Sequence, residues 1–173
     1  RFAVYSHIMT ACAGASLSAV FFTITGFPRM AGYSTITFLY VFAMHTFNRF
    51  LSYSADRFNA PDRAFLSARS GNMFLTAGTL SLAAAAGISW TMGTLHLLTL
   101  CLFSVPGIIY PLNILPASVK NLFRYRSLRD IPGSKDVAAG LGWAFIIVLF
   151  PSITAPGRIS PAAGVLFVLI FML

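Results

Sequence analysis

The sequence predicts an all-α fold, a polytopic bundle of transmembrane helices with about six spans. Of its 173 residues, 57% are hydrophobic and only 9% are charged, whereas a soluble domain usually carries about 25% charged residues. A helix needs about 20 apolar residues to cross a bilayer, and several apolar runs follow one another along the chain. These observations exclude a soluble domain with a charged shell.

Each span is expected from an apolar run and from the breaks beside it. The first run is rich in small residues, which allow close helix packing in lipid, and glycine and proline in "GFPRMAGYS" end it. The second run leads into a polar stretch. Only a tight turn near "GISWTMG" separates the third and fourth runs, and a second polar stretch precedes the fifth. The turn "TAPGRISP" precedes the sixth. The expected spans are about 4–27, 33–47, 72–90, 91–112, 137–153 and 162–173.

The chain is expected to form a single transmembrane domain over residues 1–173. It opens without methionine and ends within an apolar run, which indicates a piece of a longer protein, incomplete at its C-terminus. Cys12 and Cys101 lie far apart in apolar runs and lack metal-type spacing, so both are expected to be small buried hydrophobic residues.

The charged residues indicate which side each connection faces. Six helices with short connections place the start of the first helix, the second-to-third connection and the fourth-to-fifth connection on one side. All four aspartates and ten of the twelve Lys and Arg residues lie there, and only Arg29 and Arg158 lie on the other side. The positive-inside rule therefore predicts that residues 48–70 and 116–136 are cytoplasmic, as in a protein of the bacterial inner membrane. Because this asymmetry accounts for the net charge of +8, no nucleic-acid partner is expected. The ten basic residues are Arg1, Arg49, Arg57, Arg63, Arg69, Lys120, Arg124, Arg126, Arg129 and Lys135.

The first polar stretch, "MHTFNRFLSYSADRFNAPDRAFL", carries a stripe of polar side chains. Asn48, Ser52, Asp56, Asn59 and Arg63 are spaced by four, four, three and four residues, which places them on one face of a helix. The second helix is therefore expected to continue past the membrane surface until the proline at position 61 ends or kinks it. Polar residues at the membrane edge are often functional, and the alternative is a solvated helix end.

The second polar stretch, "PASVKNLFRYRSLRDIPGSKD", is suited to binding phosphate. Arg126, Arg129 and Lys135 are charged donors for phosphate oxygens, and Pro132 with Gly133 predicts a turn that leads into a helix N-terminus. The alternative is a basic cytoplasmic loop that touches anionic lipid head groups. Together, the two stretches predict a polar mouth for a diphosphate above an apolar bundle for its hydrocarbon tail.

On these motifs the chain resembles the UbiA superfamily of intramembrane prenyltransferases. The family has the pattern N-D-x-x-D-x-x-x-D just after its second helix, and here "NRFLSYSAD" lies there, with Asn48 and Asp56 matching its first and last positions. The segment "RSLRDIPGSKDVAAGLGWAF" is similar to the family's linker between helices four and five. The residues Asn48, Arg49, Asp56, Asn59, Pro61 and Arg63 resemble the pattern of one bacterial branch.

The resemblance implies an eight- or nine-helix bundle, Mg²⁺, and prenyl transfer from a prenyl diphosphate to an aromatic or lipid acceptor. Asp56 and Asn48 would be catalytic, and Asp56 with Ser52 would hold the metal. The diphosphate would be bound by the basic residues Arg63, Arg126, Arg129 and Lys135. Membrane lipids and an isoprenoid are the expected partners.

The chain departs from the family pattern where Arg49 and Ser52 replace two acidic residues. The departure leaves open a non-catalytic descendant that holds lipid, quinone or pigment, or packs as a subunit of a larger membrane complex. A further alternative is a haem anchor built on His7 and His45. A transporter is another alternative, although transporters carry polar groups at the midplane and the charges here lie at one edge.

Overall fold

The computed structural model describes residues 7–26, 30–51, 61–110, 112, 128, 131–155, 164–165 and 168–169, without the side chains of 30, 51 and 61–70. Every element in these ranges is helical, which confirms the all-α prediction. The elements are α2 (Ile8–Thr25), α3 (Met30–Leu51), α5 (Pro61–Met92), α6 (Thr94–Ile109), α8 (Ser134–Ala144), the π-helical turn η2 (Phe145–Leu149) and α9 (Phe150–Thr154).

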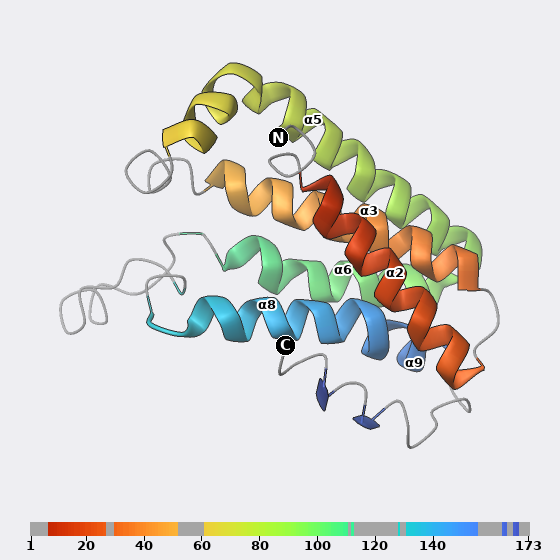
Figure 1. Cartoon of the computed structure of the whole chain (residues 1–173). Helices are drawn as coiled ribbons and strands as arrows, with labels where there is room; N and C mark the ends of the chain where they lie inside the picture. Colours follow the sequence, from red (N-terminus) through yellow and green to blue (C-terminus); the bar gives the residue numbers. More distant parts are fainter. Residues whose placement is uncertain are drawn as a thin grey trace.

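Successive helices run in opposite directions (Figure 1). As a result, one end of the molecule holds the starts of α5 and α8 and the ends of α3 and α6. The other end holds the turn between α5 and α6, where α5 stops at Met92 and α6 starts at Thr94. Gly93 joins them with φ of 142°, a backbone angle that glycine adopts without steric cost. The tight turn predicted between the third and fourth spans is therefore present.

Three helical segments are long and apolar enough to cross a membrane: Ile8–Thr25, Gly71–Met92 and Ser134–Thr154. The prediction of six spans is not confirmed. Helix α6 occupies the predicted fourth span but is a shorter apolar helix of 16 residues. Helix α3 occupies the predicted second span. Its composition is too polar for it to be counted among the three membrane-spanning segments. The predicted sixth span lies almost wholly outside the described residues.

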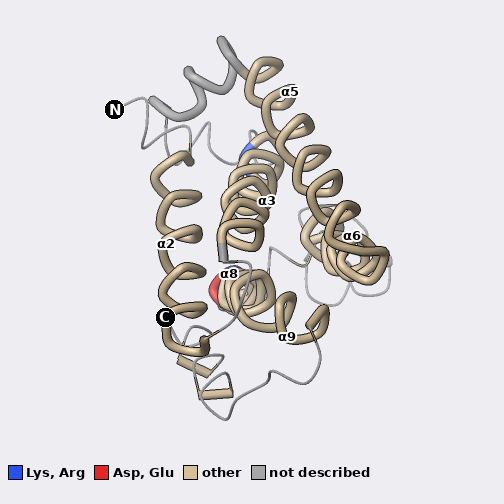
Figure 2. Tube along the Cα trace, turned by 90° about the vertical axis from the view of Figure 1, so that its right-hand side faces the viewer, with Lys and Arg blue, Asp and Glu red and all other residues tan. Residues whose placement is uncertain are grey.

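Helix α3 is the central helix and packs along both α2 and α5. It carries hydroxyl and imidazole groups on several faces, and yet much of it is buried. Its neighbours are apolar: α2, α6 and residues 71–92 of α5 contain no charged residue (Figure 2). The polar side chains of α3 are thus covered by apolar helical segments, as expected when the outer surface faces lipid.

The second helix does not continue to position 61 as one rod. Helix α3 ends at Leu51 and a separate helix, α5, begins at Pro61, so the prediction that Arg63 belongs to the same helix as Asn48 is wrong. Proline suits the first position of a helix because its missing N–H would be unsatisfied there in any case. Pro61 therefore starts a helix, and residues 52–60 lie outside the described residues.

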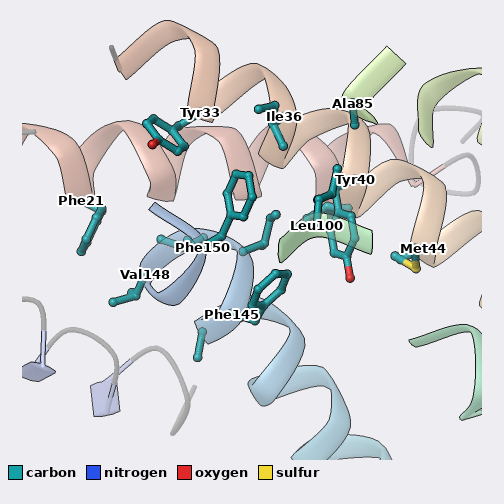
Figure 3. Close-up of a cluster of buried hydrophobic side chains, with 14 of the residues drawn as sticks. Phe21, Tyr33, Ile36, Tyr40, Met44, Ala85, Leu100, Phe145, Val148 and Phe150 are labelled. Atoms are coloured by element: carbon teal, nitrogen blue, oxygen red, sulfur yellow. The ribbon is translucent and has the colours of Figure 1, made fainter. Parts of the chain in front are cut away.

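The last long helix widens into the π-helical turn η2 just before Pro151. A proline lacks an N–H and clashes with the carbonyl of the residue four positions earlier, here Ile147. In η2 the N–H of Phe150 instead bonds the carbonyl oxygen of Phe145, and the wider turn accommodates the ring. The buried side chains of this segment meet those of α3 in an aromatic core (Figure 3). Within it Phe103 of α6 stacks on Phe145, with ring centroids 4.1 Å apart.

Cys12 and Cys101 are both exposed on helix surfaces, so the prediction that they are buried is wrong. Apolar surroundings in sequence indicate burial only when the solvent is water. On a bundle whose outer surface faces lipid, an apolar side chain can lie outside as readily as inside.

Candidate functional site

The candidate site lies at the end of the molecule where α3 and α6 end and α5 and α8 begin, which we call the basic end (Figure 1). The described helix ends here carry Arg49, Arg63, Arg69 and Lys135. Of these four residues, Arg49 and Lys135 have described side chains.

Two of the seven predicted site residues have described side chains. Asn48 is half-buried near the end of α3, and Lys135 is exposed at the start of α8. Arg63 lies in the first turn of α5, with its side chain not described. The antiparallel order therefore brings these three helix ends to one end of the bundle. The other four predicted residues, Ser52, Asp56, Arg126 and Arg129, lie outside the described residues.

The arginine that replaces an acid of the family pattern contacts α5. The Arg49 guanidinium lies 6.0 Å from the centroid of the Phe74 ring, which is within cation–π distance. This contact joins the last turn of α3 to α5, and it gives Arg49 a packing role beside its charge.

The start of α8 is held against α6 by hydrogen bonds. The Ser134 hydroxyl donates to the carbonyl oxygen of Leu128 at 2.8 Å, and its oxygen lies 3.1 Å from the Tyr110 hydroxyl at the end of α6. Gly133 precedes the helix with φ of 76°, a left-handed angle that favours glycine. The predicted turn before the fifth helix is thus present, and it places Lys135 in the first turn of α8.

The described residues do not by themselves form a magnesium site. Of the proposed oxygen donors only Asn48 is described, and Mg²⁺ in proteins usually takes one or two carboxylates. No group of three or more His, Cys, Asp or Glu side chains occurs within the described ranges. The assignment of Mg²⁺ rests on Asp56 and remains a prediction.

At the opposite end of the bundle, a buried polar chain joins three helices. The Tyr33 hydroxyl lies 2.9 Å from Nε2 of His96 and 3.0 Å from Oγ1 of Thr154. Thr154 donates its own proton to the carbonyl oxygen of Phe150, so it accepts from Tyr33. The Tyr33 oxygen then accepts from His96, which places a proton on Nε2.

Sequence reasoning did not find this chain of hydrogen bonds. Tyr33 lies 63 positions from His96 and 121 positions from Thr154 in the sequence. Tyr33 and His96 belong to different predicted spans, and Thr154 begins the turn predicted after the fifth. A histidine within an apolar run was the one available signal. These hydrogen bonds join α3, α6 and α9 to one another.

A pair of histidines lies where α2 begins beside α3. His7, just before α2, and His45 of α3 have ring centroids 5.5 Å apart, and the Trp143 ring of α8 lies 6.4 Å from His45. The sequence placed both histidines near the same ends of their helices, and the structure brings their rings together. His7 has φ of 61°, a left-handed backbone that is uncommon outside glycine.

Comparison of the chain with protein-family models, with curated proteins and with solved structures finds no match. An apolar helical body with basic groups gathered at one end suits a ligand with an anionic head and a hydrocarbon tail.

Proposed function

We propose that the chain is a UbiA-like integral membrane protein that transfers a prenyl group from a prenyl diphosphate to an aromatic or lipid acceptor. One observation carries the proposal: the helix ends that bear Asn48, Arg63 and Lys135 are all on the same side of an apolar bundle, at its basic end. A diphosphate head would meet cationic groups there while its isoprenoid tail remains in apolar surroundings.

In this proposal, the basic side chains bind the head of the substrate and stabilise its departure. Cleavage of an allylic C–O bond leaves negative charge on the diphosphate, and fixed cationic donors stabilise that charge as it develops. Arginine can do so through two parallel hydrogen bonds, whereas lysine acts as a point charge. The donors would be Arg63, Arg126, Arg129 and Lys135. Asp56 and Ser52 would hold Mg²⁺, with Asn48 beside them.

The second candidate is a non-catalytic relative that holds lipid, quinone or pigment, or serves as a subunit of a membrane complex. The contact of Arg49 with Phe74 favours it. A residue that replaces a metal-binding acid and packs against a neighbouring helix is a structural substitution. In either case the protein would lie in the bacterial inner membrane with residues 48–70 and 116–136 in the cytoplasm.

The test is an assay of the full-length protein in nanodiscs with Mg²⁺, a long-chain prenyl diphosphate and a panel of aromatic and lipid acceptors. We expect release of diphosphate, and we expect Asp56→Asn to lower the rate by about 100-fold or more, the usual cost of removing a group that acts directly in catalysis. Asp136→Asn is the matched control, because Asp136 is exposed in the first turn of α8 and has no assigned role. It should leave the rate unchanged.

The outcomes separate the two candidates. The absence of both turnover and binding of the prenyl diphosphate would contradict the enzyme. If, in addition, the purified protein carries a lipid, quinone or pigment, or always travels with other membrane subunits, the non-catalytic candidate is favoured. Equal losses in Asp56→Asn and Asp136→Asn would contradict the assigned role of Asp56.

A further inference from the structure

We propose that His7 and His45 form a binding site for a divalent transition-metal ion of the Zn²⁺ class, at the junction of α2 and α3. The two rings come from different helices and lie next to one another, with centroids 5.5 Å apart and ring planes inclined by 33°. The site is distinct from the Mg²⁺ of the proposed prenyl transfer, because imidazole nitrogen prefers Zn²⁺, Cu²⁺ or Ni²⁺ to Mg²⁺.

The separation of the rings fits two ligands of one ion. An imidazole nitrogen binds Zn²⁺ at about 2.1 Å, so each ring centroid lies about 3.2 Å from the ion. Two rings at a tetrahedral angle would then have centroids about 5.2 Å apart, and two rings in line would have them about 6.4 Å apart. The observed 5.5 Å is close to the tetrahedral value. It does not suit the linear arrangement that the two axial ligands of a haem require.

The two histidine rings are tilted and are not stacked, with a spacing close to that of the packed rings Phe22 and Tyr33, whose centroids are 5.3 Å apart at 36°. The histidines differ from that pair in their ring nitrogens, which can bind a metal ion. Each imidazole also has two nitrogens, so a hydrogen bond at one of them orients the ring and leaves the other to bind a metal.

The backbone and the neighbouring helix both hold this arrangement. His7 has φ of 61° and ψ of 9° immediately before α2, and strained backbone of this kind is found preferentially at functional sites. Trp143 of α8 packs against His45, with ring centroids 6.4 Å apart, and thereby limits the orientations open to that ring. The ion would therefore link α2 to α3 beside α8, with water or an anionic ligand in its remaining positions.

The experiment measures Co²⁺ binding to the full chain in detergent, purified with a tag that contains no histidine. Co²⁺ reports its ligands by visible absorption. We expect one ion per chain, displaced by Zn²⁺, and binding weakened by more than about tenfold in His7→Gln and in His45→Gln, since even outer-shell changes cost about 10–100-fold. The chain has 3 histidines, so His96→Gln, at the opposite end of the bundle, is the matched control and should bind as the wild type does.

A second variant distinguishes loss of a metal ligand from misfolding. His45→Cys, made in a background with Cys12→Ser and Cys101→Ser, supplies a thiolate in place of the imidazole. It should bind Co²⁺ and add a sulfur-to-cobalt band in the near ultraviolet, because thiolate is a stronger and softer ligand. Failure of the wild type to bind Co²⁺ more tightly than the His7→Gln/His45→Gln double variant would overturn the proposal, as would His45→Cys binding without that band.

Discussion

At the scale of single residues, the absence of a side chain at position 78 allows α3 and α5 to approach closely. A Cβ atom on Gly78 would lie 3.2 Å from Cγ2 of Thr46 and 3.3 Å from Cε1 of Phe47. These distances are shorter than ordinary van der Waals contacts. Small residues at helix contacts are the usual device for close packing in lipid, where no hydrophobic effect drives helices together.

We therefore expect Gly78→Leu to force α3 and α5 apart and to lower the free energy of unfolding by about 1–3 kcal/mol, the usual cost of overpacking. Gly87→Leu on the same helix is the control, because Gly87 is exposed and a Cβ there meets nothing within 4 Å. It should change stability by less than about 0.5 kcal/mol. Unfolding in mixed micelles measures both, and equal effects would show that Gly78 has no special role.

The sequence was least informative about which individual residues share a helix or a contact. The predicted stripe included Asn48 and Arg63 because the spacing was helical throughout, and the break between Leu51 and Pro61 was not visible in that spacing. Pro61 could be interpreted as the end or the beginning of a helix, and the structure makes it a beginning. The pairing of His7 with His45 depends on how α2 packs on α3, which no local pattern specifies.

At the scale of elements, the hydrogen-bond chain of Tyr33, His96 and Thr154 joins α3, α6 and α9. We expect Tyr33→Phe to lower the free energy of unfolding by about 1–3 kcal/mol, since it removes two bonds and leaves a buried donor of His96 without its acceptor. Tyr33 is 3% exposed, so water would not replace the lost hydroxyl.

Thr91→Val tests whether the burial of the hydroxyl matters. The Thr91 hydroxyl is exposed and bonds only to the carbonyl oxygen of Ile88 in its own helix. Its loss should change stability by less than about 0.5 kcal/mol. If Tyr33→Phe lowered the free energy of unfolding by no more than Thr91→Val in the same unfolding titration, the hydrogen bonds of Tyr33 would not be what holds the three helices together.

The helical elements themselves could largely be predicted from sequence. Apolar runs with glycine or proline between them predicted α2, α3, α6 and the α8–α9 segment to within several residues, and they predicted the turn at Gly93. The π-helical turn before Pro151 could not be predicted, because proline in a helix is compatible with a kink, a break or a widened turn. The choice among these depends on packing, here the stacking of Phe145 on Phe103.

At the scale of the whole molecule, the outer surface is apolar and the charges lie at the helix ends. Large hydrophobic side chains are exposed along the helices, among them Leu80, Leu98 and Leu102, each at least 60% exposed. In water such a surface would cause aggregation, whereas in a bilayer it faces lipid. The ends of α3 and α6 and the starts of α5 and α8 lie at the basic end (Figure 1), so all four face the same side of the membrane.

This dependence gives the sharpest test of the membrane topology. Positions 135 and 91 are both exposed, and they lie near opposite ends of the bundle, at the start of α8 and at the end of α5. If the basic end is cytoplasmic, as the positive-inside rule predicts, Lys135→Cys should react with a membrane-impermeant maleimide only after cells are permeabilised. Thr91→Cys should react in intact cells. Both variants require the background Cys12→Ser and Cys101→Ser, because both native cysteines are exposed. Labelling of both positions in intact cells would contradict a spanning bundle, and the reversed pattern would place the basic end, with the proposed diphosphate site, outside the cytoplasm.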